Sequence, residues 1–363
     1  MARPRLVVIG VGHLGKEHAR ILAGLPDVEL VGVADVNAEQ ADAVARRHGT
    51  RAYTDHKLLM QAVDAAVIVV PTAYHHAVAG EFLRRGIHLL VEKPLAANLE
   101  QAEELTELAG RHGALLQVGH IERFNPAFEE LERRPLQPKF VTCERLGPFS
   151  GRSTDVGVVL DLMIHDLDLL LALVQSPVRS VEAIGVSVLG GHEDMASARL
   201  TFANGCVANV SASRVNPVPL RHMHVWAPEG YASLDFARRR LTLIQPSEQL
   251  RQRGLDPRKL PPTVAATLKD DMFGRHLQVL DLDRNAGDQL TRELQHFIHC
   301  VRTGARPRVS GEDGRDAIAL ATRVLDSLRS HRWDGRADGP TGPSHLPIPL
   351  GTLFQPLEEK AAA

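Results

Sequence analysis

The chain has 363 residues, of which 44% are hydrophobic and 24% are charged, as in ordinary globular proteins. This length exceeds what one hydrophobic core usually serves, so we expect about two domains. Lys and Arg together number 42 and Asp and Glu 44. The balance leaves no excess of positive charge for binding nucleic acid or an anionic membrane surface.

The three cysteines, Cys143, Cys206 and Cys300, are far apart in the sequence. Their odd number and the lack of C-x-x-C spacing predict no disulfide framework and no metal site, and favour a reducing cytoplasm. The most apolar stretch, residues 156–174, is interrupted by acids and a histidine, and the N-terminal apolar run soon meets Lys16. We therefore expect neither a transmembrane helix nor a signal peptide.

Up to about residue 120, short β-branched runs alternate with helical patterns. The runs that predict strands are 5–10, 28–35, 65–71, 87–93 and 114–120. Helices are predicted at 37–48 and 98–113, opened by Asn37 and Asn98 and, in the second, closed by Gly113. Strands that are apolar on both faces and alternate with helices predict a parallel sheet covered on both sides. We therefore predict an α/β, doubly wound domain over residues 1–122.

After about residue 122, one apolar helix near 157–174 is followed by strand-like runs at 178–188, 195–203, 206–214, 220–227 and 231–237. Asn204-Gly205, between two of these runs, is a strong hairpin signal. Residues 246–287 give no clear pattern, and helices are predicted near 288–302 and 312–330. We expect an antiparallel sheet packed on helices over 123–332, then a Gly- and Pro-rich tail over 333–363 that is an arm or disordered.

The segment "VVIGVGHLGKEHA" places Gly10, Gly12 and Gly15 in a G-x-G-x-x-G arrangement after a strand and at the start of a helix. The first glycine permits a tight turn, the second lets the backbone approach a pyrophosphate, and the third lets helix and strand pack closely. The phosphates would lie at the helix N-terminus, beside His13 and Leu14.

The second predicted strand ends in Asp35, 20 residues after Gly15. A carboxylate at this place accepts hydrogen bonds from both ribose hydroxyls and repels a 2′-phosphate. No arginine follows within "VNAEQ", so the sequence favours NAD over NADP. The alternative, a glycine-rich turn with an unrelated surface aspartate, leaves this agreement of motif, strand and spacing unexplained.

The segment "VEKPLAANLE" raises a different question, because an apolar strand runs directly into Glu92, Lys93 and Pro94. Lysine is among the residues least often found in a core. Either Lys93 is a surface residue after an edge strand, or it contacts a ligand at the carboxyl edge of the sheet, where open α/β sheets bind ligands.

In "VLDLMIHDLDLLLAL", Asp161 and His165 are four residues apart, and Asp168 follows three residues later. On an α-helix these side chains share a face. A carboxylate beside an imidazole raises the proton affinity of the ring and fixes its orientation, which suits a general base. The alternative is a helix with satisfied surface acids and one core histidine.

Together these features resemble the Gfo/Idh/MocA family of dehydrogenases over roughly residues 4–330. The resemblance is carried by "GVGHLG", Asp35, "VPTAYHHAVAGEFLRRGIHLLVEKPLA" and "DLMIHDLD". It implies a Rossmann domain and a C-terminal α+β domain with an open, largely antiparallel sheet. In the family this sheet commonly forms a subunit interface, so a homodimer or homotetramer is expected.

The resemblance also implies roles for individual residues. Lys93 matches the active-site lysine, and Asp161 and His165 match a D-x-x-x-H pair. His165 would take a hydroxyl proton, Asp161 would hold the imidazole, and Lys93 would stabilise alkoxide charge during hydride transfer to nicotinamide. Whether Lys93 or His165 takes the proton stays open. The residues implied to lie near the cofactor are Gly10, Gly12, His13, Leu14, Gly15, Asp35, Thr72, His75, Glu92 and Lys93.

The segment "VGHIERFNPAFEEL" is similar to a subgroup that acts on nucleotide sugars, the UDP-N-acetylglucosamine 3-dehydrogenases linked to lipid A precursors. Besides Lys93 and His165, Arg123 and Asn125 would then contact the sugar or diphosphate, because arginine binds phosphate oxygens bidentately. Alternatively, Arg123 forms an interdomain salt bridge and Asn125 only starts a helix. Other functions left open are a dehydrogenase of a free polyol and a regulatory protein that binds NAD without turnover; the histidine spacings predict no metal site.

Overall fold

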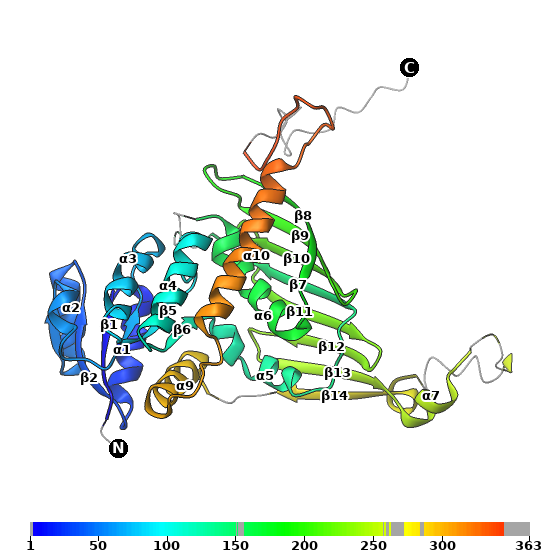
Figure 1. Ribbon diagram of the computed structural model, residues 1–363. Helices are drawn as coiled ribbons and strands as arrows, with labels where there is room; N and C mark the ends of the chain where they lie inside the picture. Colours follow the sequence, from blue (N-terminus) through cyan, green and yellow to red (C-terminus); the bar gives the residue numbers. More distant parts are fainter. Residues whose placement is uncertain are drawn as a thin grey trace.

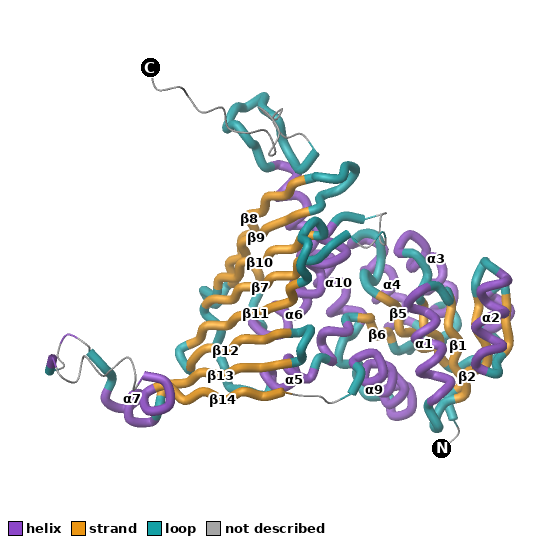
Figure 2. Tube along the Cα trace, turned by 180° about the vertical axis from the view of Figure 1, so that it is seen from behind, coloured by secondary structure: helices purple, strands orange, loops and turns teal. Residues whose placement is uncertain are grey.

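The computed structural model describes residues 3–149, 151, 156–256, 258, 261–262, 272–283 and 287–344. These residues form two sheets, one of six strands and one of eight, with helices packed around and between them (Figures 1 and 2). No helix in the described ranges has both the length and the apolar character needed to cross a bilayer.

The first sheet is parallel throughout and has the strand order β3-β2-β1-β4-β5-β6. Its strands are β1 Arg5–Ile9, β2 Glu29–Ala34, β3 Arg51–Tyr53, β4 Ala65–Ile68, β5 His88–Glu92 and β6 Leu116–Gly119. Every residue of β4 and β6 is buried, as expected for a sheet covered on both faces. The predicted doubly wound fold is therefore confirmed. The strand order reverses between β1 and β4, which places a ligand crevice at their carboxyl ends.

Four helices follow strands of this sheet: α1 His13–Gly24, α2 Ala38–His48, α3 Thr72–Leu83 and α4 Leu99–Arg111. The predicted caps of α2 and α4 are confirmed, because Asn37 and Asn98 each accept a hydrogen bond from a backbone N–H of the first turn. By contrast, α1 begins after Gly12 and α3 after Pro71, and neither has a side-chain cap. Both helices therefore present free N–H groups at the crevice.

The second sheet has the order β14-β13-β12-β11-β7-β10-β9-β8 and is antiparallel except for the β7–β10 pair. Its strands are β7 Phe140–Leu146, β8 Val178–Val186, β9 Met195–Phe202, β10 Val207–Ser213, β11 Leu220–Ala227, β12 Gly230–Asp235, β13 Arg240–Pro246 and β14 Leu277–Asp283. The predicted hairpin is confirmed, since Gly205 has a φ of 83° and Phe202 N–H donates to Cys206 O at 2.8 Å.

The segment without a clear sequence pattern, 246–287, contains helix α7 Glu248–Arg253 and the edge strand β14. Residues 257, 259–260, 263–271 and 284–286 of this segment lie outside the described residues.

The remaining helices are α5 Pro126–Glu132, α6 Ile164–Val174, α9 Gln289–Thr303 and α10 Gly311–Ser330. Helix α9 inserts Leu290, Leu294 and Phe297 into the core on one side of the first sheet. Helix α10 contributes Ala317 to the core on the other side of that sheet and Val324 to the core of the second sheet. The two sheets are thus joined by one continuous helix, which runs between them in Figure 1.

The first part of the predicted tail is folded. Trp333 Nε1 donates to Gly342 O at 2.8 Å, and Ser187 N–H, just beyond β8, donates to Pro343 O at 3.1 Å. The expectation of an arm or disorder over 345–363 concerns residues outside those described.

Candidate active site

The glycine-rich loop after β1 has the geometry that a dinucleotide needs. Gly10 has a φ of +85°, and a Cβ there would lie 2.6 Å from Val69 O. A Cβ on Gly15 would lie 1.9 Å from Gly10 O, whereas a Cβ on Gly12 would have nothing within 4 Å. The first and third glycines are therefore required by backbone packing, and the second leaves open space, as the sequence predicted. His13 and Leu14 open α1 and are exposed beside this space.

Asp35 lies at the carboxyl end of β2, beside this loop. Its Oδ2 accepts hydrogen bonds from Val11 N at 2.8 Å and Gln40 Nε2 at 3.0 Å, and its Oδ1 accepts from Asn37 N at 2.9 Å. These three donors fix the carboxylate against the glycine loop. The chain thus provides both a cradle for a pyrophosphate and a carboxylate for a ribose, a donor set that fits NAD.

Lys93 follows β5 directly and reaches across to the second half of the chain. Its Nζ donates to Asp161 Oδ1 at 3.0 Å and to Asp161 O at 2.7 Å. The side chain of Lys93 is 19% exposed and that of Asp161 is 23% exposed. Lys93 is therefore neither a free surface residue nor a core residue, and its ammonium lies at the junction of the two halves.

The helix that carries Asp161 differs from the prediction. Val159–Met163 forms a π-helical turn, and the α-helix begins only at Ile164. In the π-helical turn the carbonyl oxygen of Asp161 accepts a hydrogen bond from Lys93 Nζ. The predicted contact between Asp161 and His165 is wrong, because the carboxylate of Asp161 pairs with Lys93 instead. Among the described residues, His165 Nδ1 has no hydrogen-bond partner.

Burial lowers the pKa of His165 well below its ordinary value of 6.5, and the nearby cations Lys93 and Arg145 lower it further. The predicted rise from neighbouring carboxylates is therefore wrong. The physical reason is that Asp161 and Asp168 are each paired with a cation. The imidazole is neutral at pH 7 and can accept a proton.

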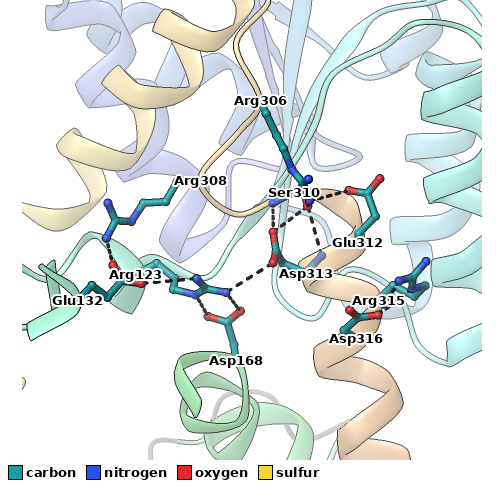
Figure 3. A network of polar contacts seen from close by, with 10 residues as sticks. All are labelled: Arg123, Glu132, Asp168, Arg306, Arg308, Ser310, Glu312, Asp313, Arg315 and Asp316. Atoms are coloured by element: carbon teal, nitrogen blue, oxygen red, sulfur yellow. Dashed lines mark hydrogen bonds and ion pairs between the residues drawn. The ribbon is translucent and has the colours of Figure 1, made fainter. Parts of the chain in front are cut away.

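Arg123 belongs to a network of polar contacts, in which its pair with Asp168 is buried (Figure 3). Its Nε and Nη2 donate to the two carboxylate oxygens of Asp168 at 2.7 and 3.0 Å, and Glu132 and Asp313 lie at 3.9 and 3.7 Å. Burial alone would lower the pKa of Arg123, but these carboxylates raise it. The predicted substrate contact is wrong, because Arg123 is 7% exposed and its guanidinium is committed to this buried salt bridge.

The predicted substrate contact of Asn125 is also wrong. This side chain has no exposed surface; its Oδ1 accepts from Ala127 N at 3.1 Å, and its Nδ2 donates to Glu122 Oε2 and Phe236 O. Asn125 starts α5, which was the alternative interpretation of the sequence.

The side chain of Glu92 is buried at the carboxyl end of β5, and its contact with the cofactor stays a prediction. It is 7% exposed, and its Oε1 lies 2.8 Å from His18 Nε2 on α1. Burial opposes ionisation of Glu92, but the hydrogen bond and charge of His18 hold its pKa below the ordinary value. Glu92 therefore supports the strand end from which Lys93 projects.

His75 lies between the ends of β4 and β5. Its Nδ1 and Nε2 are each 2.8 Å from a carbonyl oxygen, those of Pro94 and Val70. Thr72, the first residue of α3, is partly buried at the crevice. Contact of Thr72 and His75 with nicotinamide stays a prediction.

Sequence reasoning missed His120, which follows β6. The ring is 1% exposed, and neither nitrogen has a hydrogen-bond partner among the described residues. Its centroid lies 6.2 Å from that of His165, with the two rings at 89°. Burial lowers the pKa of His120, although the charge of Asp168 opposes this. The available signal was a polar residue directly after a buried strand, as for Lys93.

Arg145 on β7 was also missed. Its Nε and Nη2 each donate to Asp166 at 2.9 Å, and its Nη1 donates to Glu122 Oε1 at 2.9 Å. The start of α6 is therefore held twice, through Arg145 to Asp166 and through Arg123 to Asp168. These two bidentate pairs anchor the turn of α6 that directly follows His165.

Comparison with known proteins gives consistent matches. Residues 4–120 match the profile of the Gfo/Idh/MocA oxidoreductase family, NAD-binding Rossmann fold, and residues 137–233 match the C-terminal domain of the same family. A UDP-N-acetylglucosamine 3-dehydrogenase from Acidithiobacillus ferrooxidans is 37% identical over 89% of this chain and 97% of its own. The solved structure of that organism's UDP-N-acetylglucosamine 3-dehydrogenase GnnA superposes with a TM-score of 0.80, at 36% identity over 90% of this chain and 98% of that one. A scyllo-inositol 2-dehydrogenase (NAD(+)) from Bacillus subtilis is 27% identical over 90% of this chain and 94% of its own.

Proposed function

The chain belongs to the Gfo/Idh/MocA family of NAD-binding oxidoreductases, and we propose that it oxidises the C3 hydroxyl of UDP-N-acetylglucosamine to the 3-keto sugar. The observation that carries the reaction class is the contact of Lys93 Nζ with Asp161 Oδ1 at 3.0 Å, four residues before His165. This contact brings a cation and a neutral base together at the carboxyl edge of the dinucleotide-binding sheet.

In the proposed reaction, His165 accepts the proton of the substrate hydroxyl. Burial and neighbouring cations lower its pKa, so the imidazole is unprotonated before the reaction and free to take this proton. An ammonium has three N–H donors. Asp161 takes two of those on Lys93, through its carbonyl and carboxylate oxygens. The third is left for the reacting oxygen, where the ammonium stabilises developing alkoxide charge. Asp161 therefore orients Lys93 rather than His165. Bound NAD supplies the acceptor for the hydride that leaves C3.

The choice of a nucleotide sugar is supported by the 37% identical UDP-N-acetylglucosamine 3-dehydrogenase, which this chain covers almost completely. The second candidate is oxidation of a free polyol such as inositol, supported by the 27% identical inositol dehydrogenase. A 3-keto nucleotide sugar suits a later amination step, so we place the reaction in an amino-sugar route toward lipid A precursors. The cysteines Cys143, Cys206 and Cys300 are free and buried, which suits the reducing cytoplasm.

The outward face of the eight-stranded sheet supports a homodimer or homotetramer. Trp226 is 40% exposed there and packs against Phe140 and Tyr231, with ring centroids 5.3 Å away in both cases. A cluster of aromatic rings on an exposed sheet face is typical of a subunit interface. A Trp226→Glu variant should then have a lower mass by light scattering, and an unchanged mass would refute this contact.

The test of the reaction is the appearance of NADH absorbance when the protein meets NAD and UDP-N-acetylglucosamine, with myo-inositol as the comparison substrate. An aminotransferase and glutamate should be added to remove the keto product, because an unfavourable equilibrium could hide the signal. NADH with the UDP-sugar and none with inositol is the expected result. Turnover of inositol alone would replace the proposal with the polyol reaction, and NAD binding without any turnover would favour a regulatory protein.

A further inference from the structure

Arg221 projects from the second sheet toward the candidate active site. It is the second residue of β11 and pairs in register with Arg145 of β7. Residues directly opposite each other in an antiparallel pair point to the same face of the sheet. Met223 and Val225 share this face and have no exposed surface. Arg221 therefore belongs to the row of side chains that faces α6. It lies at the end of this row, and its side chain is exposed.

The two arginines differ in how their charge is balanced. Arg145 is buried and is bound by Asp166 and Glu122, the first of which follows His165 in the chain. Arg221 is exposed, and its guanidinium makes no hydrogen bond or ion pair with any residue that the structure describes. Asp235 on β12 is in register with His222, on the face of the sheet opposite to Arg221, and it is shared by His222 and Arg238. Among the described residues, the guanidinium of Arg221 is thus a cation without a partner, whereas the charges around it are paired.

Electrostatics place this cation close to the reacting groups. The charge of Arg221 contributes to the lowered pKa of His165, after burial and the closer cations Lys93, Arg145 and His120. It also acts on Asp166, where it opposes the rise in pKa that burial causes. Arg221 therefore lies within electrostatic reach of the proposed base and of the residue that follows it.

The chemistry of a nucleotide sugar explains a cation at this place. Its diphosphate is attached at C1, two carbons from C3, so the group that binds the diphosphate must lie near the base that serves C3. Arg123, which the sequence suggested for this role, is consumed by Asp168. A guanidinium presents a planar fork of N–H donors that matches phosphate oxygens bidentately.

We infer that Arg221 binds the diphosphate of the nucleotide-sugar substrate through its guanidinium at the mouth of the site. This inference rests on the proposed function. It assigns to Arg221 the selection of phosphate-bearing sugars over free polyols. Lys93 and His165 cannot make this distinction, because sugars and polyols of both kinds present the same reacting hydroxyl.

The test is calorimetric titration of the full-length protein, saturated with NADH, with UDP. The variants are Arg221→Gln, which removes the charge, and Arg221→Lys, which keeps the charge and loses the fork. Arg46→Gln is the matched control, since it removes an exposed arginine from the last turn of α2, outside the site. We expect Arg221→Gln to weaken UDP binding about ten- to hundredfold, Arg221→Lys to weaken it less, and Arg46→Gln to bind as the wild type.

The same variants give a second measurement in steady-state kinetics with UDP-N-acetylglucosamine. Loss of an interaction made equally in the ground and transition states raises KM and leaves kcat unchanged. We expect this pattern for Arg221→Gln, with an unchanged Kd for NADH as proof that the fold is intact.

Two failures can be told apart. If wild-type protein binds UDP and Arg221→Gln binds it equally well, the role of Arg221 is refuted while the proposed function stands. If wild-type protein binds NADH but neither binds UDP nor oxidises the UDP-sugar, the proposed function fails and the inference fails with it.

Discussion

Replacing Arg123 by methionine should destabilise the protein strongly without changing its ligand binding. The change keeps most of the side-chain length but leaves Asp168 as a buried carboxylate, 2% exposed, without its bidentate partner. Breaking a buried ion pair from one side typically costs about 3–5 kcal/mol. Glu132 and Asp313 would lose a neighbouring cation as well. We therefore expect the free energy of unfolding to fall by at least about 3 kcal/mol.

The measurement is urea denaturation followed by circular dichroism, with two comparison variants. Arg20→Met removes a surface pair with Glu17, in which the side chains are 57% and 49% exposed, and should change stability by less than about 1 kcal/mol. The double variant Arg123→Met/Asp168→Leu removes both buried charges and should recover much of the loss, since an apolar replacement of a buried pair is often neutral.

The opposite pattern would refute the structural role. If Arg123→Met unfolds at the same urea concentration as Arg20→Met, yet its KM for UDP-N-acetylglucosamine rises tenfold or more, then Arg123 serves the substrate. The buried salt bridge with Asp168 would in that case not describe the working enzyme.

Three further predictions concern the site and its support. Lys93→Met removes the ammonium that binds Asp161, so kcat should fall at least about a hundredfold while the Kd for NAD stays unchanged. Single-turnover NADH absorbance measures the loss of rate, and fluorescence titration measures the Kd. Because the pKa of His165 is lowered from 6.5, the acid limb of a pH profile of kcat/KM should lie below pH 6.5, and a limb above that value would contradict the assignment. Burial and the charge of Glu92 raise the pKa of Glu293 well above 4.5. As the pH rises, Glu293 therefore ionises in the unfolded chain before it ionises in the folded protein. The free energy of unfolding of the wild type should fall from about pH 4.5 up to the raised pKa, by about 1.4 kcal/mol for each pH unit. Glu293→Gln lacks this loss, so its stability relative to wild type should increase over that range in thermal unfolding, and a constant difference would argue against a neutral Glu293.

Besides the parallel sheet, the sequence correctly predicted several local features. The glycine loop and the cap at Asn37 depend on residues close in the chain, and each has the predicted geometry. The three-residue strand β3 was missed because so short a run carries no period that distinguishes it from a loop.

The errors arose where distant residues decide the structure. The helical spacing of Asp161 and His165 suggested a shared face, but Asp161 lies in a π-helical turn and its carboxylate binds Lys93, which is 68 residues away in the chain. Arg123 looked available for a phosphate because its partner Asp168 lies 45 residues away and neither position marks the other. Pairing between charged residues so far apart in the chain cannot be read from local pattern.

The helix α10 has a consequence for how the site can move. Its 20 residues span about 30 Å and are packed into the cores of both sheets along their length. A hinge motion that opened the two halves would have to bend this helix or pull its apolar residues out of one core. We therefore expect the crevice to keep its width, so that the distance from the nicotinamide-binding edge to His165 is set during folding.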